Sequence, residues 1–239
     1  MSHRLPLALI ALIITISVGC REPVGLPSRD VRVATSRPVS CYPAANIETG
    51  HIDWYKGVDR IWDSYSWSWA SPITRAYHCY PGDPDRAYPR KNGYCIFTVP
   101  HFVDGSGNPA TCVCTLYYYQ TGHSGSASLE VNTWEQSVGA TWPPGSQTDC
   151  NYYFWAIWNS SDVIATDSTH AADSCWYGIP LDSSACVAIA ETAYAYPNGD
   201  GLFRTGWVYR DSVDGTYTDV AGYDYVHPPF IRVWYDDGE

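Results

Sequence analysis

The chain has few basic residues, and beyond its start it has no long apolar run. Lysine occurs only at Lys56 and Lys91, charged residues make up 16% of the 239 residues, and the formal net charge is −11. Nucleic-acid binding needs clustered Lys and Arg to neutralise phosphates, so this composition argues against it. A transmembrane helix needs about twenty apolar residues, which no segment reaches. We therefore expect neither a nucleic-acid-binding protein nor an integral membrane protein.

The amino terminus has the layout of a bacterial export signal. His3 and Arg4 precede an apolar run from Leu5 to Val18, which is followed by Gly19 and Cys20. A basic start, a short apolar stretch and small residues at its end are typical of a signal peptide. We therefore expect residues 1–19 to be a signal peptide and the protein to be exported.

Cys20 is the expected lipidation site. Ser17-Val18-Gly19-Cys20 resembles a lipobox, in which the cysteine becomes the lipidated first residue, although Leu is usual where Ser17 stands. Ser17 and Gly19 also suit ordinary signal peptidase, so cleavage without lipid is the alternative. Arg21 stands in place of the Asp that often retains lipoproteins in the inner membrane. We expect a lipoprotein of the cell surface or outer membrane, otherwise a secreted protein, whose only membrane contact is the lipid anchor.

The cysteine count also indicates an oxidising compartment. The chain has nine cysteines, and setting Cys20 aside leaves an even number. An even count in an exported protein predicts a disulfide framework whose connectivity the sequence cannot rank. Metal binding is less favoured, because there is no CxxC pair and Cys112-Val113-Cys114 is too tight for ordinary zinc spacing. The expected disulfide cysteines are Cys41, Cys79, Cys95, Cys112, Cys114, Cys150, Cys175 and Cys186.

The chain after the signal peptide reads as one all-β domain. Residues 20–45 are rich in Pro, Ser and Arg, which predicts a lipidated N-terminus and tether before a domain over residues 46–239. Short aromatic or β-branched runs, separated by Gly, Pro, Asn and Asp turns, are typical of strands. Strands are expected at Ser64–Trp69, Gly93–Pro100, Thr111–Gln120, Ala127–Trp134, Asn151–Trp158, Leu202–Arg210 and Phe230–Tyr235.

Helical character is confined to Asp182–Tyr194, where Asp182 or Ser183 is the expected N-cap before an Ala-rich body. The expected fold class is therefore an all-β, antiparallel β-sandwich that carries disulfides and one short helix.

Two segments carry a resemblance to a known family. The first joins Tyr94–Pro100 to Thr111–Tyr119 through a turn, and the second is the closing strand His227-Pro228-Pro229-Phe230-Ile231-Arg232-Val233-Trp234-Tyr235. Over about residues 50–239 their order resembles DNRLRE-type surface domains and related carbohydrate-binding-module-like jelly rolls. Thr98 stands where that family often has Asp. The resemblance implies a jelly-roll sandwich on a secreted bacterial protein, acting as a binding, adhesive or structural module.

Aromatic abundance makes carbohydrate the first candidate ligand. The chain has 11 Trp and 20 Tyr against 5 Phe. Trp and Tyr rings offer apolar faces for sugar rings, and their polar atoms can hydrogen-bond to hydroxyls, although such rings also fill sandwich cores. Alternation places Tyr65, Trp67 and Trp69 on one strand face. The other candidates lie near expected strand ends: Trp134, Trp142, Trp158 and Trp176.

A structural calcium ion is the one cofactor that the sequence suggests, and none is required. Calcium takes several oxygen ligands from flexible loops, but the same Asp and Asn residues also serve ordinary turns. The candidate ligands are Asp104, Asn108, Asn198, Asp200, Asp211, Asp214 and Asp219.

No catalytic constellation is recognisable, so we expect a protein that is not an enzyme. Gly122-His123-Ser124-Gly125-Ser126 lacks the last glycine of a nucleophile elbow and lies between two expected strands. The expected function is a structural, adhesive or self-assembling role at the cell surface, with extracellular polysaccharide or other copies of the protein as partners. The alternative is a carbohydrate-binding module that captures extracellular polysaccharide, and a polysaccharide-degrading enzyme is a more distant one.

Overall fold

The fold is built almost entirely from antiparallel strands. The computed structural model describes residues 36–56, 63–69, 73–77, 88–125, 128–136, 139–168, 170–209, 217–223 and 226–237. The strands of the first half are β1 (Ser36–Cys41), β2 (Thr49–Lys56), β3 (Asp63–Trp69), β4 (Ile73–Tyr77), β5 (Tyr88–Val99) and β6 (Cys112–Ser124). Those of the second half are β7 (Ser128–Thr133), β8 (Val163–Ser168), β9 (Cys175–Pro180), β10 (Gly201–Tyr209), β11 (Tyr217–Ala221) and β12 (Phe230–Asp236). A short 3-10 helix, η1 (Asn46–Glu48), precedes β2.

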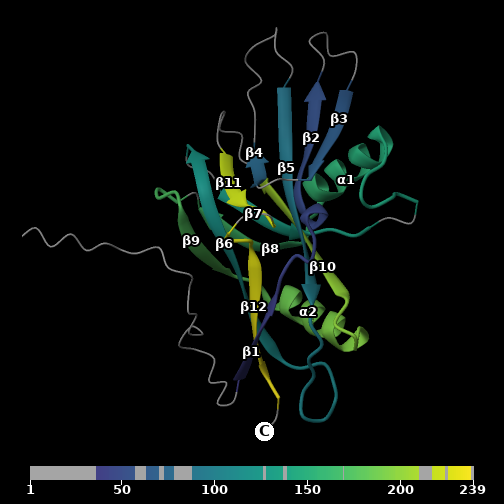
Figure 1. The fold of residues 1–239 in the computed structure, drawn as a ribbon, viewed down its shortest axis with the longest axis vertical. Helices are drawn as coiled ribbons and strands as arrows, with labels where there is room; N and C mark the ends of the chain where they lie inside the picture. Colours follow the sequence, from purple (N-terminus) through teal and green to yellow (C-terminus); the bar gives the residue numbers. More distant parts are fainter. Residues whose placement is uncertain are drawn as a thin grey trace, which may run out of the picture.

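These strands form one curled 12-stranded sheet that closes into two layers (Figure 1). Its order is β1-β12-β6-β11-β4-β5-β10-β7-β8, with β9 beside β6 and the β2–β3 hairpin beside β5. One layer is centred on β12, β6 and β9, and the other on β5, β10 and β7. The predicted antiparallel β-sandwich is confirmed.

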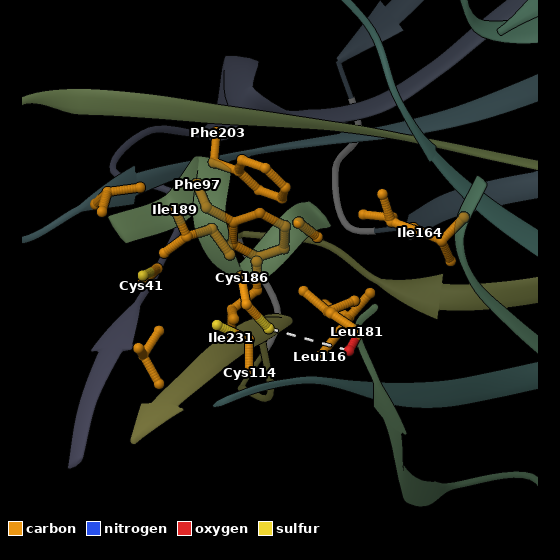
Figure 2. Close-up of a cluster of buried hydrophobic side chains, with 14 of the residues drawn as sticks. Cys41, Phe97, Cys114, Leu116, Ile164, Leu181, Cys186, Ile189, Phe203 and Ile231 are labelled. Atoms are coloured by element: carbon orange, nitrogen blue, oxygen red, sulfur yellow. Dashed lines mark hydrogen bonds between the residues drawn. The ribbon is translucent and has the colours of Figure 1, made fainter. Parts of the chain in front are cut away.

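Alternate side chains of the central strands fill the space between the layers. In β6 these are Cys114, Leu116 and Tyr118, which belong to one buried cluster with Phe97 of β5 and Trp207 of β10. Figure 2 shows Cys114, Leu116 and Phe97 within this cluster. Successive strand residues point to opposite faces, so every second residue of each strand faces outward. Because of this alternation, the residues that could contact a ligand are those that face outward.

Helix α2 (Ser183–Ala195) closes one end of the sandwich, where it packs on β5, β6 and β10. Its N-cap is Asp182, whose Oδ1 accepts a hydrogen bond from the backbone N–H of Ala185 at 2.8 Å. Ile189 and Ala193 are fully buried between the layers. The predicted helix and its cap are therefore both present.

Helix α1 (Gln147–Asn159) overturns the prediction of a strand at Asn151–Trp158. The aromatic run has the composition of a strand, but its buried residues are Cys150, Tyr153, Phe154 and Ile157, which recur at helical spacing. The N-cap Ser146 accepts a hydrogen bond from the backbone N–H of Asp149 at 3.1 Å. Packing against the outer face of the β5 and β10 layer stabilises the helix over the local preference for strand.

The fold also begins earlier than the expected domain start at residue 46. Strand β1 pairs with β12 from Ser36 opposite Asp236 to Cys41 opposite Ile231. Cys41 is fully buried in the sandwich core. Residues expected to form the end of a tether are therefore an edge strand, because β12 offers them a hydrogen-bonding partner. None of the helices in the described ranges is long and apolar enough to cross a membrane.

Candidate functional site

An aromatic surface covers the outer face of the β12, β6 and β9 layer. The members on β6, β9 and β12 alternate with core residues, so their side chains point away from the sandwich interior, while Tyr42 follows β1 and His227 precedes β12. Their exposure ranges from 42% for Tyr42 to 0% for Phe230, which forms the floor of the group. We refer to this group as the aromatic strip, and its residues are Tyr42, Tyr117, Tyr119, Trp176, His227 and Phe230.

Ring contacts make the strip continuous. Phe230 lies at its centre, with ring centroids 5.3 Å from Tyr42, 5.0 Å from Tyr117 and 5.5 Å from Trp176. Trp176 continues to Tyr119 at 5.7 Å and to His227 at 5.6 Å. These separations are those of offset and edge-to-face aromatic pairs, which hold one another in place. The result is a pre-ordered apolar platform at the surface of the protein.

Cross-strand register explains how distant segments meet in the strip. Phe230 is opposite Tyr117, and Tyr117 is opposite Gly178, so the three residues lie in line across β12, β6 and β9. A Cβ atom at Gly178 would lie 2.6 Å from Tyr117 Cε1. The absence of a side chain at Gly178 therefore lets the Tyr117 ring extend over β9.

Arg232 gives the strip a positive charge. Its guanidinium lies over the Phe230 ring, 5.4 Å from the ring centroid. Burial raises the pKa of Tyr117 and nearby Arg232 opposes that shift, which is consistent with a cation beside the strip. Within the described part of the chain, Arg232 Nε has no hydrogen-bond partner. The charge of the Arg232 guanidinium would attract an anionic ligand such as a carboxylate to this side of the strip.

A polar network fixes the segment that leads into β9 and hence into Trp176. The side-chain amide of Gln120 donates to the backbone carbonyl of His170 at 3.0 Å and to Asp173 Oδ1 at 2.9 Å. His123 Nδ1 lies 2.7 Å from the same Asp173 oxygen. The His170 ring stacks on Tyr177, with ring centroids 3.6 Å apart. Residues 170–174 are therefore anchored to β6 just before the strand that carries Trp176.

Asp173 gives this network a dependence on pH. Burial raises the Asp173 pKa, but hydrogen bonds from His123 and Gln120 outweigh burial and leave it below its ordinary value. A carboxylate whose pKa is lower in the folded state stabilises the fold at pH values above its unfolded-state pKa of about 4. That contribution is lost as the pH falls through the folded-state pKa.

We predict that Asp173→Asn lowers the free energy of unfolding at pH 6 by less than about 1 kcal/mol, since the side chain is 41% exposed. The difference from the wild type should shrink as the pH is lowered below about 4, where the wild-type carboxylate becomes protonated. Urea unfolding followed by circular dichroism at several pH values measures this. If the difference in unfolding free energy instead grew as the pH was lowered, the ionised Asp173 carboxylate would not be the stabilising group.

Among the residues predicted to bind carbohydrate, only Trp176 lies in the strip. Trp134 is 5% exposed and packs against Trp142, with ring centroids 5.2 Å apart, on the α1 side of the molecule. Trp158 stacks on Phe154 within α1. Trp142 and Trp158 are half-buried on the α1 side, so the carbohydrate-binding role predicted for these three residues stays a prediction. For Tyr65, Trp67 and Trp69 the structure describes the backbone of β3 alone, so their predicted role stays a prediction.

The structure describes five of the seven predicted calcium ligands, and their role stays a prediction. Asp104 Oδ1 accepts hydrogen bonds from the backbone N–H groups of Ser106 and Asn108, at 2.9 and 2.8 Å, which is ordinary turn chemistry. Asn198 and Asp200 lie in the turn before β10, and Asp219 is buried in β11. Asp211 and Asp214 lie outside the described residues. No cluster of three or more His, Cys, Asp or Glu side chains suited to a metal occurs in these ranges.

The cysteines differ from the expected disulfide framework. Cys175 is disulfide-bonded, and Cys79 lies outside the described residues. The other six are free thiols, so the four expected disulfides are not all present: Cys41, Cys95, Cys112, Cys114, Cys150 and Cys186. The positions of two free cysteines explain part of this difference. Cys95 lies in the core between the layers, whereas Cys150 lies in α1 on the outer side of one layer, so these two cysteines are on opposite faces of that layer.

The residues that sequence reasoning missed are Tyr42, Tyr117, Tyr119, His227, Phe230 and Arg232. Their only sequence signal is that they follow or alternate with buried residues on strands far apart in the chain. No protein-family model matches this chain, and no curated protein is significantly similar to it. The resemblance to DNRLRE-type domains therefore stays a prediction.

Proposed function

We propose that the protein is an exported adhesive module that binds extracellular polysaccharide on the aromatic strip. The observation that carries this proposal is the continuous set of aromatic rings on an outward-facing sheet surface, from Tyr42 through Phe230 and Trp176 to Tyr119. Export and attachment at the cell surface through Cys20 rest on the lipobox-like start of the sequence.

The chemistry of the strip suits sugars. Pyranose rings present C–H faces that pack on aromatic rings, while their hydroxyls need hydrogen-bond partners at the edge. Arg232 and His227 supply polar groups beside the rings of Phe230 and Trp176. The strip crosses the three strands β12, β6 and β9 and continues to Tyr42, so it would contact several sugar units of a chain. Rings that are already in contact lose little conformational freedom on binding, which favours affinity.

Trp176→Ala tests this proposal. Trp176 contacts three other members of the strip, and such central aromatic residues dominate binding energies. We expect affinity for a retained polysaccharide to fall at least about tenfold, equivalent to about 1.4 kcal/mol. The measurement is affinity electrophoresis against a panel of neutral and uronate-containing polymers, followed by calorimetry with the polymer that retains the protein.

Tyr194→Ala is the matched control, because Tyr194 is 50% exposed on α2 and lies outside the strip. Gly178→Val is a second probe, since its side chain would displace the Tyr117 ring without removing any aromatic residue. The wild type should be retained by at least one polymer, Tyr194→Ala should match it, and Gly178→Val should weaken binding. A wild type retained by none of the polymers, or equal retention of Trp176→Ala, would refute the proposal.

Self-association is the second candidate, favoured by the position of β9. This strand pairs with β6 on one side, and no partner strand for its other side occurs among the described strands. A free strand edge beside exposed aromatic rings can pair with a second copy. Sedimentation velocity over a range of concentrations distinguishes the two: assembly without polysaccharide, abolished by Trp176→Ala, would assign the strip to a protein–protein contact.

A further inference from the structure

Three cysteines meet at the junction of β6 and α2. Cys112 and Cys114 occupy alternate positions on β6 and therefore face the same side of the strand, with their sulfurs 3.7 Å apart. The thiol of Cys112 donates to the backbone carbonyl of Cys186 at 3.2 Å. Figure 2 shows the Cys186 side chain directed toward Cys114, with its sulfur 4.0 Å from the carbonyl oxygen of Leu181. We call Cys112, Cys114 and Cys186 the thiol cluster.

The cluster forms one wall of a surface pocket of about 310 Å³. Cys112 and Cys186 line the pocket, together with Ala110 before β6 and Val187 of α2. Glu191, one turn further along α2, supplies a carboxylate to the lining. Cys114 is fully buried behind the pocket, and so is Cys41 in β1. Cys112 is half-buried and Cys186 is 7% exposed, and these two cysteines line the pocket, whereas Cys114 does not.

The position of Cys186 favours its thiolate. The backbone N–H of Cys186 donates to the carbonyl of the N-cap Asp182 at 3.2 Å, so Cys186 belongs to the first turn of α2. The first turn of a helix carries partial positive charge, which lowers the pKa of cysteines located there. Hydrogen bonds from Cys112 and Cys114 lower the Cys186 pKa, while burial and the nearby Asp182 carboxylate oppose this shift. A hydrogen bond with Cys114 lowers the Cys112 pKa, but the hydrogen bond with Cys186 and burial outweigh it and raise that pKa, so Cys186 is the more readily ionised of the two.

We propose that the thiol cluster is a redox site for small disulfides, in which Cys186 is the attacking thiolate and Cys112 is the resolving thiol. The Cys186 sulfur attacks one sulfur of a disulfide R–S–S–R, a Cys186–S–S–R bond forms, the R–S–S–R bond breaks, and RS⁻ leaves. Cys112 then gives its proton to the RS⁻ that has left, its sulfur bonds to Cys186 Sγ, the Cys186–S–S–R bond breaks, and the second RS⁻ leaves and takes up a proton from water. The two protein thiols are oxidised to one cystine, and the disulfide is reduced to two thiols.

Cys114 is the positioning residue of this site. It is buried away from the pocket, and its sulfur lies next to that of Cys112. It remains a thiol after the Cys112–Cys186 bond forms, because three sulfurs can form only one bond among themselves. Glu191 in the pocket lining gives the site a preference in charge, since a disulfide bearing ammonium groups is attracted to it and a dicarboxylate is repelled.

The first experiment measures thiol reactivity in the purified, reduced protein. Iodoacetamide is added at pH values from 5 to 8, and the alkylated cysteines are identified by peptide mass spectrometry. Because the Cys186 pKa is lowered, its alkylation rate should fall less than that of an ordinary thiol as the pH is lowered from 8 to 5. An unfolded thiol of ordinary pKa slows by about tenfold for each pH unit below 8. Cys95 and Cys150, whose pKa values are raised by burial, serve as internal controls and should react at least about tenfold more slowly at pH 6.

The second experiment uses cystamine as the disulfide and dithiodipropionate as its anionic counterpart. Wild-type protein should form a cystine that joins Cys112 to Cys186, faster with cystamine than with dithiodipropionate. Cys112→Ser should instead accumulate a mixed disulfide on Cys186. Mass spectrometry detects it directly as an added mass, so the result does not depend on how stable the variant is. Cys150→Ser should behave as the wild type does.

Three results would overturn the proposal. The first is a Cys186 alkylation rate that rises with pH as an unfolded thiol does. The second is a first cystine that joins Cys114 to Cys186. The third is an absence of mixed disulfide in Cys112→Ser. None of these results bears on polysaccharide binding, because the pocket and the aromatic strip do not share residues.

Discussion

Replacement of Trp207 by Ala is expected to lower the free energy of unfolding by about 3–5 kcal/mol, the usual range for removing a large aromatic side chain from a core. Trp207 is 1% exposed and lies in the middle of β10, opposite Gly93 of β5 and Val131 of β7. Its ring meets Tyr118 of the other layer edge-to-face, with centroids 5.5 Å apart. It is therefore one of the main contacts that hold the two layers together.

The Trp207 indole also takes part in a buried hydrogen-bond chain. Its Nε1–H donates to Thr205 Oγ1 at 3.0 Å, and Thr205 Oγ1–H donates to the backbone carbonyl of Cys95 at 2.9 Å. Trp207→Phe keeps one aromatic ring but loses the N–H donor and part of the buried volume, so it should cost about 1–3 kcal/mol. Urea unfolding followed by far-ultraviolet circular dichroism measures both variants. Equal destabilisation by Ala and Phe would mean that the hydrogen bond, rather than packing between layers, provides the stabilisation.

Alternation along strands was the most informative feature of the sequence. In β6, Cys114, Leu116 and Tyr118 face the core, and Tyr117 and Tyr119 face outward, as a period of two requires. Helix α2 was equally predictable, because Asp182 caps an Ala-rich run. Both features are local, so the residues that determine them are neighbours in the chain.

The aromatic strip could not be predicted in the same way, because it depends on strand order. Tyr42, Tyr117, Trp176 and Phe230 come from four segments that only the pairing of β12 and β9 with β6 brings together. The amino-acid composition also led to the wrong prediction of a strand at Asn151–Trp158, where the structure has α1. Its aromatic run favours a strand, and the helix is stabilised by contacts with β2, β3, β5 and β10 that are distant in sequence.

Those contacts also determine which face of the sandwich is available to a ligand. Helix α1 covers the outer face of the β5 and β10 layer, where it buries Ile52, Tyr94, Ile96 and Val208. Neither of the helices in the described residues packs on the corresponding outer face of β12 and β9. Helix α1 therefore covers one outer face of the sandwich, whereas the exposed and half-buried rings of the strip lie at the other: Tyr42, Tyr119, Trp176 and His227.

Gly206→Ala tests this division of roles. Gly206 faces α1, and a Cβ atom there would lie 2.4 Å from Asn132 Oδ1 and 2.6 Å from Ile157 Cγ2. Asn132 Nδ2 donates to the carbonyl of Ile157 at 2.8 Å, a buried bond that ties α1 to the sheet. Displacement of the helix should lower the free energy of unfolding by about 1–3 kcal/mol. The control Gly145→Ala should have almost no effect, since its Cβ would come no closer than 4.0 Å to Asp149.

The same variant separates the two faces functionally. If α1 moves away from the sheet, apolar residues such as Tyr94 and Ile96 become accessible, so binding of the dye ANS should increase in Gly206→Ala. The strip lies on the other layer and shares no residue with this contact, so polysaccharide affinity should stay within about twofold of the wild type, a difference of about 0.4 kcal/mol. A parallel loss of affinity and stability would mean that the ligand binds on the α1 side, where Trp134 and Trp142 lie, rather than on the strip.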